Sequence, residues 1–126
     1  MRNASYSWVW EIEVTDEFLL WWRRLDDEQR EAVTVRVELL GERGPDLGRP
    51  VVERIHASRH HNMKELRASK GGALRVLFMF DPRRAVILLL GGDKTGEWDR
   101  WYESAIPAAD DLYDAYLTEL RDEGLI

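Results

Sequence analysis

The chain has 126 residues, of which 44% are hydrophobic and 33% charged, a balance typical of one folded globular domain rather than a disordered or fibrous chain. No stretch approaches the roughly 20 apolar residues of a membrane-spanning helix, and the first residues lack the apolar segment of a signal peptide, so we expect a cytoplasmic protein without membrane contact. The absence of cysteine excludes disulfides, thiolate metal sites and a cysteine nucleophile.

The charges are unevenly distributed along the chain. The formal net charge of −6 argues against a nucleic-acid binder, because affinity for phosphate backbones depends mostly on lysine and arginine. Residues 43–84, however, contain ten basic and four acidic residues, whereas the rest of the chain contains eight basic and twenty acidic residues. This asymmetry predicts a cationic working face on an acidic body, and the alternative is a set of solvated charges in loops and at strand edges.

A strand and two helices are predicted for the first third of the chain. Residues 7–14 alternate between apolar and polar side chains, which indicates a half-buried strand. Thr15 or Asp16 can cap a short amphipathic helix that follows. A second helix is predicted over residues 27–42. Its valines also alternate as in a strand, but its length, its early acidic residues and the glycines after it favour a helix.

The rest of the chain predicts a sheet followed by helical segments. Residues 41–50 have turn composition, and residues 51–57 fit a short extended piece. Three strands with tight connections then indicate an antiparallel meander, in the stretches 63–69, 73–81 and 85–92. Helical segments follow over 96–105 and 107–124, and Pro107 is expected at the first position of the second. The predicted order β-α-α-β-β-β-α is an α+β fold, with one domain over 1–126 and a helical C-terminal extension over 97–126.

Charged residues enter the strands of this meander. Because strand side chains alternate, Leu66 should point into the core while Glu65 and Arg67 point to the opposite, open face. Arg75 interrupts an otherwise apolar strand, and a guanidinium is not buried without a partner, so it should lie at an open edge or meet a carboxylate. A structural pair of Glu65 with Arg75 or with Arg67 is therefore one interpretation of these residues.

The other interpretation is a phosphate-binding site made by Arg67, Arg75 and Lys94. Lys94 follows the last predicted strand, where Gly91 and Gly92 leave room for a backbone or a ligand. Three cations at neighbouring strand ends could stabilise the extra negative charge of a phosphodiester transition state. In RNA the adjacent 2′-hydroxyl is itself the nucleophile, so such a site needs no metal and no cofactor.

Further residues near this sheet are candidates for RNA contact. His60 and His61 precede the sheet, and either could act as a general acid or base; the pair lacks the spacing of known metal sites, so we expect no metal. Tyr102 lies in a tryptophan-rich helical segment whose rings fit core packing, although bases can stack on such rings. Lys64, Lys70, His60, His61 and Tyr102 are the residues that we predict to bind RNA.

The stretches GPDLGRPVVERIHASRHHNMKELR and ALRVLFMFDPRRAVILLLGGDKTG resemble the RelE/HigB superfamily of bacterial toxin-antitoxin toxins, in particular its phage-derived HigB-like branch. The resemblance covers roughly residues 44–96. It implies a small endoribonuclease, an mRNA interferase that enters the ribosomal A site and cuts mRNA, with a helix-turn-helix antitoxin as its partner. It also implies that the site residues are Glu65 and Arg67 from ELR, Arg75 from ALRVLF and Lys94 from GGDK.

Two alternatives to this function are open at the level of sequence. One is a ParE-like toxin that binds gyrase and cuts nothing. The other is an inactive remnant that keeps the fold and its antitoxin contact. The cationic residues at the strand ends favour the nuclease, and the acidic net charge favours the alternatives.

Overall fold

The computed structural model describes residues 2–6, 9–68, 73–93 and 98–126. A six-stranded sheet forms its centre, in the order β1-β2-β6-β5-β4-β3. Strands β2 and β6 are parallel, and every other neighbouring pair is antiparallel. The strands are β1 (Arg2–Tyr6), β2 (Glu11–Thr15), β3 (Val52–Arg54), β4 (Lys64–Ala68), β5 (Leu74–Phe80) and β6 (Ala85–Asp93).

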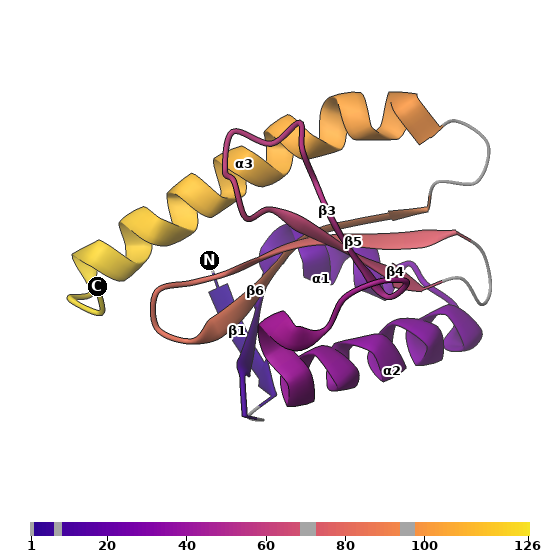
Figure 1. Ribbon diagram of the computed structural model, residues 1–126, viewed down its shortest axis with the longest axis horizontal. Helices are drawn as coiled ribbons and strands as arrows, with labels where there is room; N and C mark the ends of the chain where they lie inside the picture. Colours follow the sequence, from indigo (N-terminus) through magenta and orange to yellow (C-terminus); the bar gives the residue numbers. More distant parts are fainter. Residues whose placement is uncertain (1, 7–8, 69–72, 94–97) are drawn as a thin grey trace.

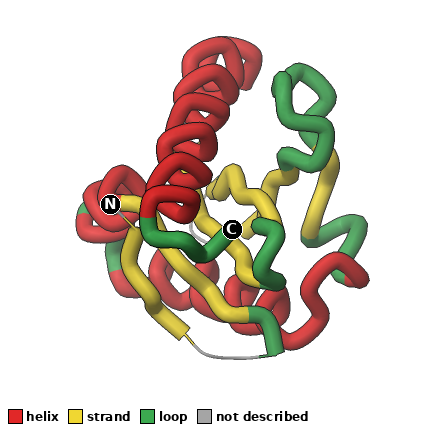
Figure 2. Tube along the Cα trace, turned by 90° about the vertical axis from the view of Figure 1, so that its left-hand side faces the viewer, coloured by secondary structure: helices red, strands yellow, loops and turns green. Residues whose placement is uncertain are grey.

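Helices cover both faces of this sheet. They are α1 (Asp16–Arg23), α2 (Asp27–Arg43), the short 3-10 helix η1 (Gly44–Asp46) and α3 (Trp98–Asp122). Figure 1 shows α3 on one side of the strands and α2 on the other, and Figure 2 shows the same layers from the side. Each face has its own apolar core, one under α1 and α2 and one under α3. The predicted α+β class is confirmed. Within the described ranges, no helix is long and apolar enough to cross a membrane.

The N-terminal strand differs from its prediction. The sequence indicated one strand over residues 7–14, whereas the structure has β1 before this stretch and places β2 at its end. Trp10 lies before β2, and its backbone N–H donates to the carbonyl of Gly41 at 3.0 Å. Its ring occupies the space over Gly44, where a Cβ would lie 2.2 Å from the indole Nε1. Trp10 thus packs on the end of α2, a long-range contact that strand alternation does not predict.

Both N-terminal helices begin as predicted. The Thr15 side chain accepts a hydrogen bond from the backbone N–H of Phe18 at 3.0 Å, which caps α1. Asp26 and Gln29 form a reciprocal capping box at the start of α2. Helix α2 ends at Arg43, and its C-cap Gly44 has a positive φ of 56°, which favours glycine.

The C-terminal helix is continuous, so the prediction that Pro107 begins a new helical segment is wrong. Pro107 lies inside α3, which runs for 25 residues. Its buried side chains recur every three to four residues on both sides of the proline: Ala105, Ile106, Ala109, Tyr113, Tyr116 and Leu120. Because this apolar stripe packs on the sheet throughout and Pro107 itself faces solvent, packing outweighs the local helix-breaking tendency.

The meander of the three central strands is confirmed. Strands β4, β5 and β6 pair consecutively and antiparallel, and the stretch predicted as extended contributes the short strand β3 at the edge. Strand β5 therefore has β4 on one side and β6 on the other, which makes it an inner strand of the sheet. The pairing of β5 with β6 has a register shift between Leu77 and Phe78.

Candidate functional site

Two arginines and a glutamate meet on the neighbouring strands β4 and β5. Arg67 and Arg75 are register partners, and Glu65 lies on the same face two residues before Arg67. The Nε and Nη2 atoms of Arg67 donate to Oε2 of Glu65 at 3.1 and 3.0 Å. The Nε atom of Arg75 lies 3.7 Å from Oε1 of Glu65. We call these three residues the Glu65 cluster. It brings together three of the four residues that the sequence predicted as catalytic.

The burial of this cluster corrects one prediction. Glu65 was expected on an open face, but it is only 2% exposed. The reason is α3, which packs over that face and buries Leu77 and Met79 together with Glu65. The side chains of Arg75 and Arg67 are 12% and 34% exposed. A buried carboxylate is stable only with charged or hydrogen-bonding partners, and the arginines supply them.

Tyr102 completes the surroundings of Glu65. Its hydroxyl donates to Oε1 of Glu65 at 2.5 Å. Burial raises the pKa of the Tyr102 hydroxyl well above its usual range, and the hydrogen bond to Glu65 and the charge of Glu65 raise this pKa further. The phenol therefore stays protonated at neutral pH and acts as a hydrogen-bond donor. Tyr102 is half-buried in the core under α3 rather than presented as an open stacking surface.

The space at the end of β6 is filled by tryptophans. The sequence predicted that Gly91 and Gly92 leave room for a ligand. A Cβ at Gly91 would lie 2.1 Å from the ring of Trp21 on α1, and a Cβ at Gly92 would lie 2.1 Å from the ring of Trp101 on α3. The two glycines thus make room for one indole ring on each face of the sheet. These rings fill the space that was predicted for a ligand, so this prediction is wrong.

The predicted lysines are not part of the described cluster. Lys94 and Lys70 lie outside the described residues, although Lys94 follows directly after β6, whose Gly92 is the register partner of Arg75. Lys64 lies on the opposite face of β4, with its Nζ 5.2 Å from the ring centroid of Phe80. Lys64 therefore faces away from the Glu65 cluster.

His60 and His61 lie in the loop between β3 and β4, and this loop contacts α3. The Nε2 atom of His60 is 2.9 Å from Oδ1 of Asp114, and its ring makes an edge contact with Tyr113. Arg59 also pairs with Asp114. Hydrogen bonds from Arg59 and His60 hold the pKa of the Asp114 carboxyl below its usual value. His61 is exposed. These contacts give His60 an anchoring role between the loop and α3.

This difference between the two histidines predicts a difference in stability. His60→Ala should lower the free energy of unfolding by about 1 kcal/mol, because it removes a hydrogen bond to a carboxylate and a ring contact. His61→Ala is the matched control and should change it by less than about 0.5 kcal/mol. Urea denaturation followed by tryptophan fluorescence measures both values. Equal losses for the two variants would contradict the anchoring role of His60.

A second polar network was missed by sequence reasoning. Tyr116 on α3 places its hydroxyl 2.5 Å from Oε2 of Glu13 and 2.5 Å from Oδ2 of Asp81. Arg83 donates to Glu13 at 2.7 Å and to Asp81 at 3.1 Å. Burial first, and then both carboxylates, raise the pKa of Tyr116. The network anchors the second half of α3 to β2 and to the β5-β6 hairpin. The alternation predicted for residues 7–14 places Glu13 on the polar face of its strand, and nothing in that pattern indicates that α3 covers this face.

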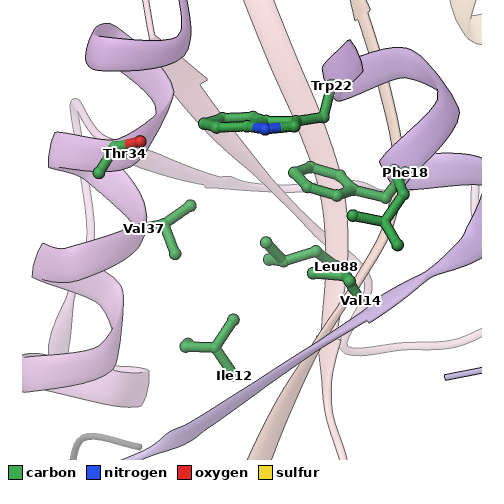
Figure 3. Close-up of a pocket in the computed structure, with 8 residues that line it drawn as sticks. Ile12, Val14, Phe18, Trp22, Thr34, Val37 and Leu88 are labelled. Carbon is green, nitrogen blue, oxygen red and sulfur yellow. The ribbon is translucent and has the colours of Figure 1, made fainter. Parts of the chain in front are cut away.

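The apolar pocket in Figure 3 lies away from the Glu65 cluster. It lies between α1, α2 and the sheet and has a volume of about 310 Å³. Seven of its lining residues are aliphatic or aromatic, and the eighth is Thr34. It offers no charge to a phosphate. Among the residues that the structure describes, no three histidine or carboxylate side chains converge as a metal site.

Comparisons with known proteins agree with the resemblance seen in the sequence. Residues 20–114 match the family described as phage derived protein Gp49-like, and the chain therefore belongs to this family. It is 50% identical over 104 residues to "Putative toxin HigB3" of Mycobacterium tuberculosis strain H37Rv. The aligned region covers 82% of this chain and 90% of that protein. It is 41% identical over 120 residues to "Putative toxin HigB2" of the same strain, covering 94% of this chain and 58% of that protein.

Proposed function

We propose that the chain is the toxin of a type II toxin-antitoxin system and that it acts as a ribosome-dependent mRNA endoribonuclease. The names of both relatives support the toxin assignment. The observation that carries the nuclease assignment is the meeting of Arg67 and Arg75 around Glu65 on adjacent strands. Two guanidiniums on one face of a sheet form a site suited to a phosphodiester.

The chemistry that we propose needs no metal and no cofactor. The 2′-oxygen of the ribose attacks the adjacent phosphorus, the bond to the 5′-oxygen breaks, and a 2′,3′-cyclic phosphate and a 5′-hydroxyl result. Arg67, Arg75 and Lys94 stabilise the additional negative charge on the phosphate during this step. Glu65 accepts the proton of the 2′-hydroxyl once the phosphate has engaged the arginines, and the protonated carboxyl returns this proton, directly or through water, to the leaving 5′-oxygen.

Several contacts outside the cluster belong to the same proposal. Lys70, His60 and His61 contribute to RNA contact from the basic part of the chain, and Lys64, on the opposite face of β4, contacts the message away from the scissile phosphate. The partner that keeps the toxin inactive is a helix-turn-helix antitoxin, and the site of action is the cytoplasm, where ribosomes and mRNA are found. Residues 1–126 act as one domain.

One observation favours a second candidate. Glu65 neutralises the arginines in this conformation and is nearly inaccessible. A toxin that acts only by protein contact, such as a ParE-like gyrase binder, or an inactive remnant would keep this ion pair as a structural element. Such a protein would tolerate replacement of the arginines as long as the fold is retained.

A reconstituted translation reaction separates these candidates. On addition of the chain, we expect protein synthesis to stop and the message to be shortened, with cuts mapped by primer extension. Message without ribosomes should stay intact under the same conditions. An intact message in a translating reaction would contradict the nuclease assignment, and inhibition of a gyrase supercoiling assay would then support the second candidate.

A further inference from the structure

We propose that residues 98–106, the first turns of α3, are a hinged cover that must swing away at Pro107 before a phosphate can reach the Glu65 cluster. The regulatory role of this cover rests on the proposed function. The hinge itself is defined by contacts within the chain and can be tested without RNA.

The cover closes the cluster through two side chains of α3. Tyr102 donates to Oε1 of Glu65, the oxygen that also faces Arg75. Trp101 lies against Gly92, whose backbone is paired with Arg75 in the sheet. With both in place, Glu65 is 2% exposed, so a phosphodiester and its ribose have no access to this carboxylate. Displacement of Tyr102 removes the neutral donor from Glu65 and opens the site toward solvent.

Pro107 supplies the hinge. It has no N–H group and so cannot donate the helical hydrogen bond to the carbonyl of Glu103, one turn earlier. Both residues face solvent, where water can satisfy that carbonyl. The helix is therefore weakest where the cover meets the rest of α3, and a change of backbone angles there costs one hydrogen bond less than elsewhere.

The two halves of α3 are held very differently. After the proline, Asp110 accepts a hydrogen bond from the backbone N–H of Arg59 at 3.2 Å, and Asp114 binds Arg59 and His60. Further along, Tyr116 joins the buried network described above. Before the proline, Tyr102 attaches α3 to the Glu65 cluster. Because the helical hydrogen bond that Pro107 cannot make lies between these two sets of contacts, the first half can open locally while the contacts of the second half stay in place.

Because the chain has no cysteine, single thiols report opening on each side of the hinge. Ala105 and Ala109 face the same core and are 3% and 0% exposed, so Ala105→Cys and Ala109→Cys form a matched pair. We expect a thiol-specific reagent to label the first variant at least about tenfold faster, since local opening exposes one thiol and the other needs global unfolding. Equal labelling rates would overturn the hinge.

The glycines of β6 supply opening variants that leave the Glu65 cluster unchanged. Gly92→Ala should push Trp101 outward and raise the ratio of the labelling rate at position 105 to the labelling rate at position 109 several-fold. Gly91→Ala creates an equal conflict with Trp21 on the other face and is the control, because it destabilises the fold in general and should not raise this ratio. An unchanged ratio in Gly92→Ala would overturn the cover.

Two further measurements distinguish a failure of the hinge from a failure of the proposed nuclease. If the cysteine variants do not fold, amide hydrogen exchange in the unsubstituted chain should be faster in residues 98–106 than in 108–122, and equal protection would overturn the hinge. In the reconstituted translation reaction, Gly92→Ala should cut message several-fold faster than Gly91→Ala. Fast labelling of the thiol at position 105 with no cutting by any variant would contradict the proposed nuclease and leave the hinge supported.

Discussion

Arg75→Ala is expected to reduce the cutting of ribosome-bound message by about 100-fold or more, because removal of one charge-stabilising donor from a transition state typically has this effect. Arg75 is the second residue of β5 and lies opposite Arg67 on β4, with its Nε atom 3.7 Å from Oε1 of Glu65. The initial rate of message cleavage in reconstituted translation measures the effect.

The control for this prediction removes the same charge from another surface. Arg23 is exposed in the last turn of α1, on the opposite face of the sheet, and Arg23→Ala should cut message at the original rate. Thermal unfolding of both variants shows whether the fold is retained. A folded Arg75→Ala variant that cuts at the original rate would contradict a role of Arg75 in charge stabilisation.

Arg83→Ala is expected to cause a large loss of stability, about 3 kcal/mol of unfolding free energy at pH 7.5. The variant leaves two buried carboxylates, Glu13 and Asp81, without the cation that both contact.

Arg84→Ala is the matched control in the same hairpin. Arg84 is exposed, and its guanidinium lies 5.2 Å from the ring of Trp10, a contact worth less than about 1 kcal/mol at such a site. Urea denaturation at pH 7.5 measures the original protein and both variants. Equal losses for Arg83→Ala and Arg84→Ala would contradict the role of Arg83 in neutralising the two buried carboxylates.

Local signals in the sequence predicted much of the fold. The structure confirms the cap at Thr15, the start of the second helix at Asp27 and the tight turn between β5 and β6, each of which is encoded within a few residues. The continuity of α3 was not predictable in this way. Pro107 is a strong local stop signal, and only the apolar stripe that packs on the sheet overrides it.

The sequence predicted that Glu65, Arg67 and Arg75 belong to one candidate site, but it did not predict what surrounds them. Alternation placed Glu65 and Arg67 on one face, and the structure brings Arg75 to them. That α3 covers this face depends on the path of a helix more than thirty residues further along the chain, which no local pattern in β4 contains. The same limit applies to the network of Glu13 and Tyr116, which are separated by 103 positions.

The most direct test of the nuclease is a synthetic message with a single ribose changed to 2′-deoxyribose in the codon at the ribosomal A site. The mechanism predicts that the ribose message is cut in this codon, with a 2′,3′-cyclic phosphate at the new end, and that the deoxyribose message stays intact there. Equal cutting of both messages would contradict attack by the 2′-hydroxyl, and cutting of neither would contradict the nuclease itself.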